Sequence, residues 1–124
     1  MKARPLIHIV DDDPAVRDSL KLFLETRGYE VEAFESGAKL LGDGAHRAEV
    51  KCLILDVNLP GDNGFDVLAK LRQNGSTVPA IFVSAHGSSA TRARAQRAQA
   101  AAFFDKPVPP SELLAAIAKA TGHT

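Results

Sequence analysis

The sequence predicts an α/β fold in which five parallel strands are covered by helices on both faces. Short apolar runs recur along the 124 residues and alternate with segments of helical periodicity. Each run is long enough for a buried strand and too short for a typical helix. Polar or charged side chains follow four of these runs, as expected where parallel strands end at one edge of a sheet.

The strands are assigned to apolar runs that are bounded by residues typical of turns or helix starts. In chain order they are predicted at 6–10, 31–34, 51–56, 78–84 and 102–106. Because consecutive strands are separated by helical segments, right-handed crossovers would make the sheet parallel.

A helix is predicted after each strand, and small polar residues mark several of the starts. Asp13 is expected to cap the first helix, with Pro14 in its first turn. Ser36 and Ser111 are expected to start the second and last helices, and the glycine-rich segment at 42–44 is expected to stop the second helix early. These boundaries place every helix between two strands or after the last one.

The predicted fourth helix, at 88–99, has no large apolar residue, so its buried face must consist of alanine. Arg92, Arg94 and Arg97 make it basic. Two interpretations remain open at this point, a solvated face and a surface for a partner.

Composition limits the functional classes. Fifteen basic and fifteen acidic residues cancel, which argues against a nucleic-acid-binding domain. The single cysteine, Cys52, excludes an internal disulfide and fits a reducing, cytoplasmic location as a buried small hydrophobe. No leader or membrane span is apparent. We expect one domain over residues 1–124.

Five side chains are predicted to meet at the carboxyl edge of the sheet. Asp11 and Asp12 follow the first strand, and Asp56 and Ser84 end the third and fourth. Lys106 ends the fifth strand and is followed by proline. Clustered carboxylates with a hydroxyl and an ammonium group indicate a site for a metal ion and a phosphoryl group.

Four motifs occur in a fixed order along the whole chain: Val-Asp-Asp, Leu-Asp-x-x-Leu-Pro-Gly-x-x-Gly, Val-Ser-Ala and Lys-Pro. Together they resemble the receiver domain of two-component response regulators. The details Ile-His-Ile-Val-Asp-Asp and Ser-Ala-His-Gly resemble the subfamily that precedes LuxR-type helix-turn-helix output domains. The resemblance implies a flavodoxin-like three-layer α/β/α sandwich with strand order 2-1-3-4-5.

The resemblance also implies a metal site and a phosphoacceptor. Asp56 would accept the phosphoryl group. Asp12, Asp56 and the backbone carbonyl of Asn58 would bind Mg²⁺ directly, and Asp11 would hold a metal-bound water. A hard divalent cation would also relieve the repulsion between these carboxylates.

The same resemblance implies roles for the remaining site residues. Lys106 would pair with the phosphoryl oxygens, and Ser84 would hydrogen-bond one of them. Phe103 occupies the aromatic switch position. Asn58 and His86 flank the path of hydrolytic water and would tune the rate of dephosphorylation.

The expected partner is a sensor histidine kinase or a phosphotransfer protein. A homodimer through the fourth helix, fifth strand and fifth helix is also expected. The domain would catalyse only its own phosphorylation and dephosphorylation, and would bind neither nucleic acid nor membrane.

Gln99 stands where the family usually has glycine, so it must adopt a less favourable backbone if the turn is left-handed.

Two alternative functions are considered. A phosphatase of the haloacid dehalogenase type would use Asp11 as its nucleophile, with Ser84 and Lys106 in later motifs. That class needs a further acidic pair after its lysine, where only Glu112 is present, and it leaves Asp56 without a role. A receiver that binds partners without phosphorylation is opposed by the complete set of site residues.

Overall fold

The computed structural model describes residues 4–44 and 49–122. Its centre is a parallel sheet of five strands in the order β2-β1-β3-β6-β7. The strands are β1 (Leu6–Val10), β2 (Glu30–Phe34), β3 (Val50–Asp56), β6 (Ala80–Ser84) and β7 (Ala102–Asp105). With β6 and β7 as the fourth and fifth strands, this is the predicted order 2-1-3-4-5.

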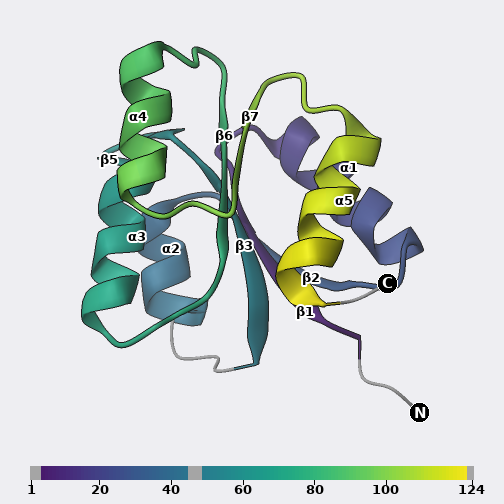
Figure 1. Cartoon of the computed structure of the whole chain (residues 1–124). Coiled ribbons are helices and arrows are strands. Elements are labelled where there is room, and N and C mark those ends of the chain that lie inside the picture. The colour runs from purple at the N-terminus through teal and green to yellow at the C-terminus, as the bar shows by residue number, and fades with distance from the viewer. Residues whose placement is uncertain (1–3, 45–48, 123–124) are drawn as a thin grey trace.

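Helices cover both faces of the sheet, which confirms the three-layer prediction (Figure 1). One face carries α1 (Pro14–Thr26) and α5 (Pro110–Thr121). The other face carries α2 (Gly37–Lys39), α3 (Gly64–Gln73) and α4 (Ser89–Arg97), with the π-helical turn η1 (Leu40–Gly44) continuing α2. Two short antiparallel strands, β4 (Asn58–Leu59) and β5 (Asp62–Asn63), form a hairpin directly after β3.

The sheet separates two apolar clusters. One contains Leu53 and Phe82 beneath α3, and the other contains Ile9 and Ile54 beneath α1 and α5. Every residue of β1 and β6 is buried, as the continuous apolar runs predict. Each fully buried Leu, Ile or Phe contributes about 1.5–3 kcal/mol of transfer free energy, so these strands hold the carboxyl edge in place. Within the described residues, no helix is long and apolar enough to cross a membrane.

Side-chain caps fix the starts of four helices. The Asp13 carboxylate accepts a hydrogen bond from the Ala15 amide at 3.0 Å, which confirms the predicted cap. Ser36 caps α2, Asn63 caps α3 and Ser88 caps α4 in the same way. The cap on α1 turns the chain immediately after the acidic residues at the end of β1.

Two predicted helix boundaries are wrong. Ser111 does not cap α5, because the helix already begins at Pro110, whose fixed φ and missing N–H suit the first position. Pro109 is the N-cap residue and makes no side-chain hydrogen bond. The segment at 42–44 does not stop the second α-helix, because α2 already ends at Lys39 and η1 continues through this segment to Gly44.

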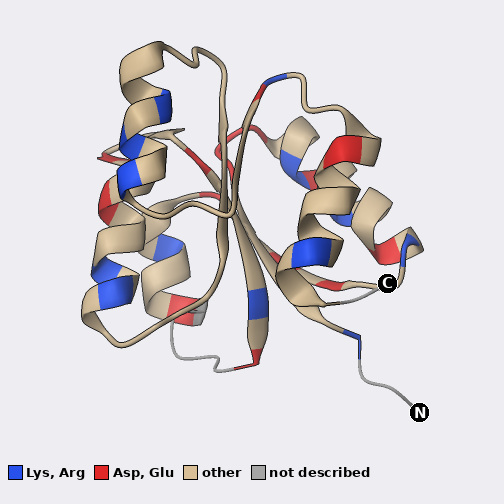
Figure 2. Ribbon diagram, viewed as in Figure 1, with Lys and Arg blue, Asp and Glu red and all other residues tan. Residues whose placement is uncertain are grey.

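The buried face of α4 is alanine, as predicted: Ala95 is the helix's one buried residue. Figure 2 shows the basic residues along this helix. They are not a simple solvated face. The Arg94 guanidinium lies 4.6 Å from the centroid of the Phe65 ring and 3.7 Å from Asp66 Oδ1. Polar and cation–π contacts therefore attach α4 to α3 where apolar burial is small.

The turn after α4 confirms the prediction made for Gln99, which has φ 58°. The Gln99 amide donates to Gln96 O and the Ala100 amide donates to Ala95 O, both at 3.0 Å. This pair of hydrogen bonds is the Schellman motif, whose left-handed residue is usually glycine. A side chain in that conformation costs about 1 kcal/mol.

Candidate functional site

The parallel register brings the predicted site residues to one edge of the sheet. Val10 lies opposite Leu55, so Asp11 and Asp56 follow at the same level on neighbouring strands. Asp56 lies opposite Val83, one residue before Ser84. Residues 84 and 105 are register partners in β6 and β7, so Lys106 extends beyond Ser84.

Three carboxylates form an acidic cluster at this edge. One oxygen each of Asp11, Asp12 and Asp56 lies within 4.8 Å of the others. Asp11 and Asp56 are 1% and 4% exposed, whereas Asp12 is exposed to solvent. Two buried carboxylates beside a third that reaches solvent fit a hard divalent cation, which takes oxygen ligands and retains some water.

Lys106 links the two buried carboxylates. Its Nζ donates to Asp11 Oδ2 at 2.9 Å and to Asp56 Oδ2 at 2.8 Å. The Lys106 backbone amide donates to Ser84 O at 2.8 Å, which aligns the residue with the end of β6. The other oxygen of Asp56 accepts from the Asn58 amide at 2.9 Å. Both oxygens of the Asp56 carboxylate are therefore oriented by the protein.

Burial has the largest effect on the pKa of Asp56. It raises the pKa of Asp56 above its ordinary value, although hydrogen bonds from Lys106 and the Asn58 amide lower it. The charge of Asp11 adds to the rise. For Lys106, burial lowers the pKa, but hydrogen bonds to Asp56 and Asp11 outweigh burial and the pKa is raised. The ammonium thus stays charged, and the ionised carboxylate of Asp56 is a costly group to keep buried.

We expect Asp56→Asn to stabilise the metal-free domain at neutral pH. A carboxyl group whose pKa is raised on folding stabilises the folded state below its unfolded pKa, and this stability is lost as pH rises through the folded pKa. Asparagine stays neutral at every pH, so the variant does not lose this stability as the pH rises. Thermal denaturation in a chelating buffer should show a rise in Tm of about 3 °C or more at neutral pH. The increase in Tm should shrink toward zero as the pH is lowered through the Asp56 pKa. An increase that does not depend on pH would contradict its attribution to the buried charge of Asp56.

Ser84 is fully buried, and its Oγ accepts a hydrogen bond from the His86 amide at 3.1 Å. This contact ties the hydroxyl to the loop that leads into α4. His86 and Asn58 are both exposed, as expected for residues at the mouth of a site. Phe103 is partly buried against the cluster beneath α3 and α4.

Two neighbours of the site were not predicted from the sequence. A Cβ at Gly64 would lie 2.5 Å from the carbonyl oxygen of Asp56, so only glycine lets the hairpin return this closely. The Gly64 amide donates to Val57 O at 2.9 Å and fixes that approach. On the other side, the Arg17 guanidinium donates to the carbonyl oxygen of Asp11 at 2.8 Å. Spacing along the chain indicates neither contact.

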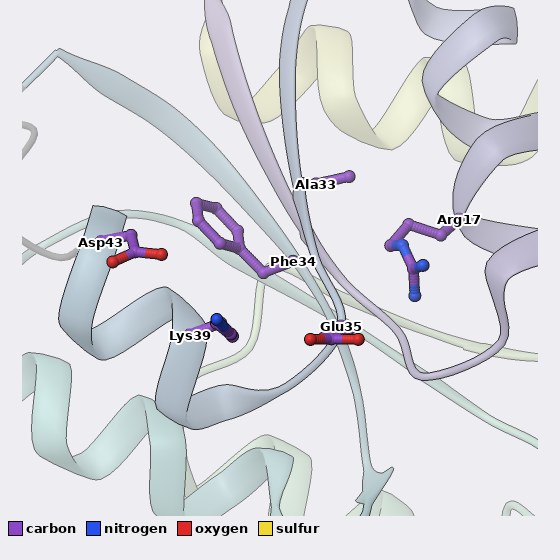
Figure 3. Close-up of a pocket in the computed structure, with 6 residues that line it drawn as sticks. All are labelled: Arg17, Ala33, Phe34, Glu35, Lys39 and Asp43. Atoms are coloured by element: carbon purple, nitrogen blue, oxygen red, sulfur yellow. The ribbon is translucent and has the colours of Figure 1, made fainter.

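A separate pocket of about 300 Å³ lies beside the end of β2 (Figure 3). Its lining mixes apolar and charged side chains, namely Arg17, Ala33, Phe34, Glu35, Lys39 and Asp43. A pocket of this size is large enough for a small ligand. We assign the site to the acidic cluster instead, because the buried carboxylates and Lys106 are not in this pocket.

The comparisons with known proteins decide the family. The family model of the response regulator receiver domain matches residues 7–118. The chain belongs to the response regulator receiver family. This receiver domain is 41% identical over 112 residues to the response regulator protein TodT of Pseudomonas putida, covering 90% of the chain and 49% of TodT. It is 32% identical over 118 residues to the transcriptional regulatory protein FixJ of Azorhizobium caulinodans, covering 95% of the chain and 56% of FixJ.

The fold of the receiver domain is shared with solved structures. A CheY-like receiver domain protein from Methanospirillum hungatei has a TM-score of 0.86 and 32% identity, with 94% of this chain and 93% of that chain covered. The family match does not favour the dehalogenase-type phosphatase or the phosphorylation-independent receiver. The receiver domain spans about half the length of the curated relatives it matches.

Proposed function

We propose that Asp56 accepts a phosphoryl group from a sensor histidine kinase or a phosphotransfer protein, and that the domain is thereby a phosphorylation-dependent signalling switch. One observation carries the proposal. The Asp56 carboxylate is buried, is held by Lys106, and lies within the acidic cluster. A receiver needs this combination of an oriented nucleophile and fixed positive charge.

Phosphoryl transfer requires mainly positioning and charge neutralisation from a protein. The Asn58 amide and Lys106 orient the two oxygens of Asp56 for attack. Lys106 would pair with the incoming phosphoryl oxygens as a compact point charge. Asp11, Asp12 and Asp56 would hold Mg²⁺, together with the Asn58 carbonyl. A bound Mg²⁺ supplies the positive charge that brings a phosphoryl dianion next to these carboxylates.

Uptake of one phosphoryl group tests the proposal. The domain is incubated with acetyl phosphate and Mg²⁺, and the intact mass is compared with that of a sample in chelator. We expect the mass of one phosphoryl group to be added only with Mg²⁺, and mapping of the labelled peptide should place it on β3. Uptake that persists in chelator, or a label on the residues that follow β1, Asp11 and Asp12, would overturn the assignment.

In this proposal, phosphorylation of Asp56 changes the position of Ser84 first and of Phe103 second. A phosphoryl group on Asp56 would draw in the Ser84 hydroxyl, because a dianion is a stronger acceptor than the groups around it. Phe103 would then move into the space left by Ser84. This domain would work in the cytoplasm, either as a stand-alone regulator or as the receiver of a longer protein that carries a LuxR-type output domain.

A homodimer through α4, β7 and α5 is the proposed readout of the switch. The half-exposed arginine side chains and weak apolar anchoring of α4 support a surface that can rearrange. Light scattering with and without beryllofluoride tests it. We expect a dimer only with beryllofluoride, and a monomer in both samples would overturn this part of the proposal.

The lifetime of the phosphoryl group should depend on Asn58 and His86. Both are exposed and lie two residues beyond Asp56 and Ser84. An amide can orient the attacking water, and a ring can orient or obstruct it. We expect Asn58→Ala and His86→Ala each to change the dephosphorylation rate by about threefold or more, with smaller effects on the phosphorylation rate. Decay of the phosphorylated mass after donor removal measures this, and unchanged half-lives in both variants would contradict it.

A further inference from the structure

Four residues around the loop between β6 and α4 form a group that we call the clasp: Gly87, Arg92, Phe103 and Asp105. The Arg92 guanidinium lies 4.8 Å from the centroid of the Phe103 ring and forms an ion pair with Asp105. One side chain of α4 therefore contacts two side chains of β7, Asp105 and the residue at the switch position itself, Phe103.

Gly87 contributes to the clasp because it has no side chain. A Cβ at this position would collide with Asp105 Oδ1 and would lie 3.1 Å from Phe103 Cε1. The absence of a side chain lets Asp105 and Phe103 lie directly against the loop. Because Asp105 Oδ1 is the end of a side chain, a methyl group at residue 87 would make the carboxylate turn away, and this turn would move Oδ2 from Arg92.

The clasp is connected to the phosphorylation site through Ser84. The Ser84 hydroxyl accepts from the His86 amide, one residue before Gly87. If Ser84 turns toward a phosphoryl group, this hydrogen bond is lost and the loop is released at one end. The other end of the loop is still held by the contacts of Arg92.

We propose that Arg92 is a positioning residue that holds Phe103 and the loop at 85–88 in the unphosphorylated arrangement, so that the clasp must open for the domain to switch. The proposal rests on the proposed function, because it assigns a role within that switch. Interactions made in only one of two states shift the population by their own free energy. A cation–π contact at a half-exposed site corresponds to roughly a two- to fivefold change in that equilibrium.

The first measurement is hydrogen exchange of the unphosphorylated domain, which does not depend on phosphorylation. Arg92→Ala, Asp105→Ala and Gly87→Ala should each speed exchange at 85–97 by roughly two- to fivefold. The double variant Arg92→Ala/Asp105→Ala should exchange no faster than the faster single variant, because both changes open one clasp. Arg97→Ala is the matched control, since Arg97 lies on the same helix, is exposed, and makes no ion pair or ring contact with the described residues.

The second measurement is the rate of phosphorylation by acetyl phosphate. Variants with an open clasp should be phosphorylated faster, by about the factor found for exchange, while Tm changes by less than about 3 °C. Arg92→Lys should lie between wild type and Arg92→Ala, because an ammonium keeps the ion pair but loses the planar stacking group. This partial rescue separates a positioning role from a general loss of stability.

The results distinguish the clasp from the proposed function. Wild-type exchange in Arg92→Ala would overturn the clasp even if the domain is phosphorylated normally. Additive effects in the double variant, or faster exchange without faster phosphorylation, would overturn it too. A wild-type domain that takes up no phosphoryl group would instead refute the proposed function, and the exchange results would still decide whether Arg92 holds the loop.

Discussion

Asp56→Asn will take up no phosphoryl group from acetyl phosphate, whereas Asp13→Asn will be phosphorylated at the wild-type rate. Asparagine keeps the shape of Asp56, and its single amide oxygen can still accept from either Lys106 or the Asn58 amide, but it lacks the carboxylate nucleophile. We expect the rate to fall by about a thousandfold or more, measured from the intact mass over time.

Asp13 is the matched control for this experiment. It lies two residues from Asp11, is exposed, and caps α1 by accepting from the Ala15 amide. Asparagine caps helices as well as aspartate does, so Asp13→Asn removes a neighbouring charge without disturbing the fold. Phosphorylation that persists in Asp56→Asn would contradict the assignment of the nucleophile. A loss of equal size in Asp13→Asn would show that net charge near the site, and not the carboxylate of Asp56, controls uptake.

Gly64→Ala should destabilise the domain and disturb Asp56 at the same time. The added methyl group would lie 2.5 Å from Asp56 O and 3.2 Å from Leu55 Cγ, and a backbone oxygen cannot rotate away. Overpacking of this kind costs about 1–3 kcal/mol, so Tm should fall by about 5–10 °C. Because the shift moves the backbone of the nucleophile, phosphorylation should also slow by about tenfold or more.

Gly42→Ala provides the comparison, since a Cβ there meets no atom of the described residues within 4 Å. We expect this change to leave both Tm and the phosphorylation rate close to wild type. If Gly64→Ala keeps the wild-type Tm and rate, the close return of the hairpin does not constrain Asp56.

The strands and the residues at their ends could be predicted because a buried strand has a recognisable apolar sequence. A parallel strand covered on both faces is continuously apolar, so the run before Asp56 identifies both the strand and the residue that leaves it. The topology then determines that Asp11, Asp56 and Lys106 meet at one edge. Gln99 was predictable for a similar reason, since a helix end that needs a left-handed residue leaves few conformations for a side chain.

Contacts that depend on side-chain reach could not be predicted in this way. Nothing in the spacing of Arg92 and Asp105, thirteen positions apart, indicates that they form an ion pair. The same holds for Gly64, because a glycine in a turn-rich segment usually serves the turn, and here it serves a close approach of two backbones. The start of α5 was mispredicted because two signals competed, and Pro110 outweighed Ser111.

The buried thiol of Cys52 gives the domain a natural reporter of its own opening. Cys52 lies in β3, the central strand, where it is 0% exposed, and burial raises its pKa to about 12. It is also the single cysteine of the chain. An alkylating reagent can react only when the centre of the sheet separates, so the labelling rate measures the population of opened molecules in native buffer. The variants discussed above can therefore be ranked without denaturant, in the same magnesium-containing solutions in which they are phosphorylated.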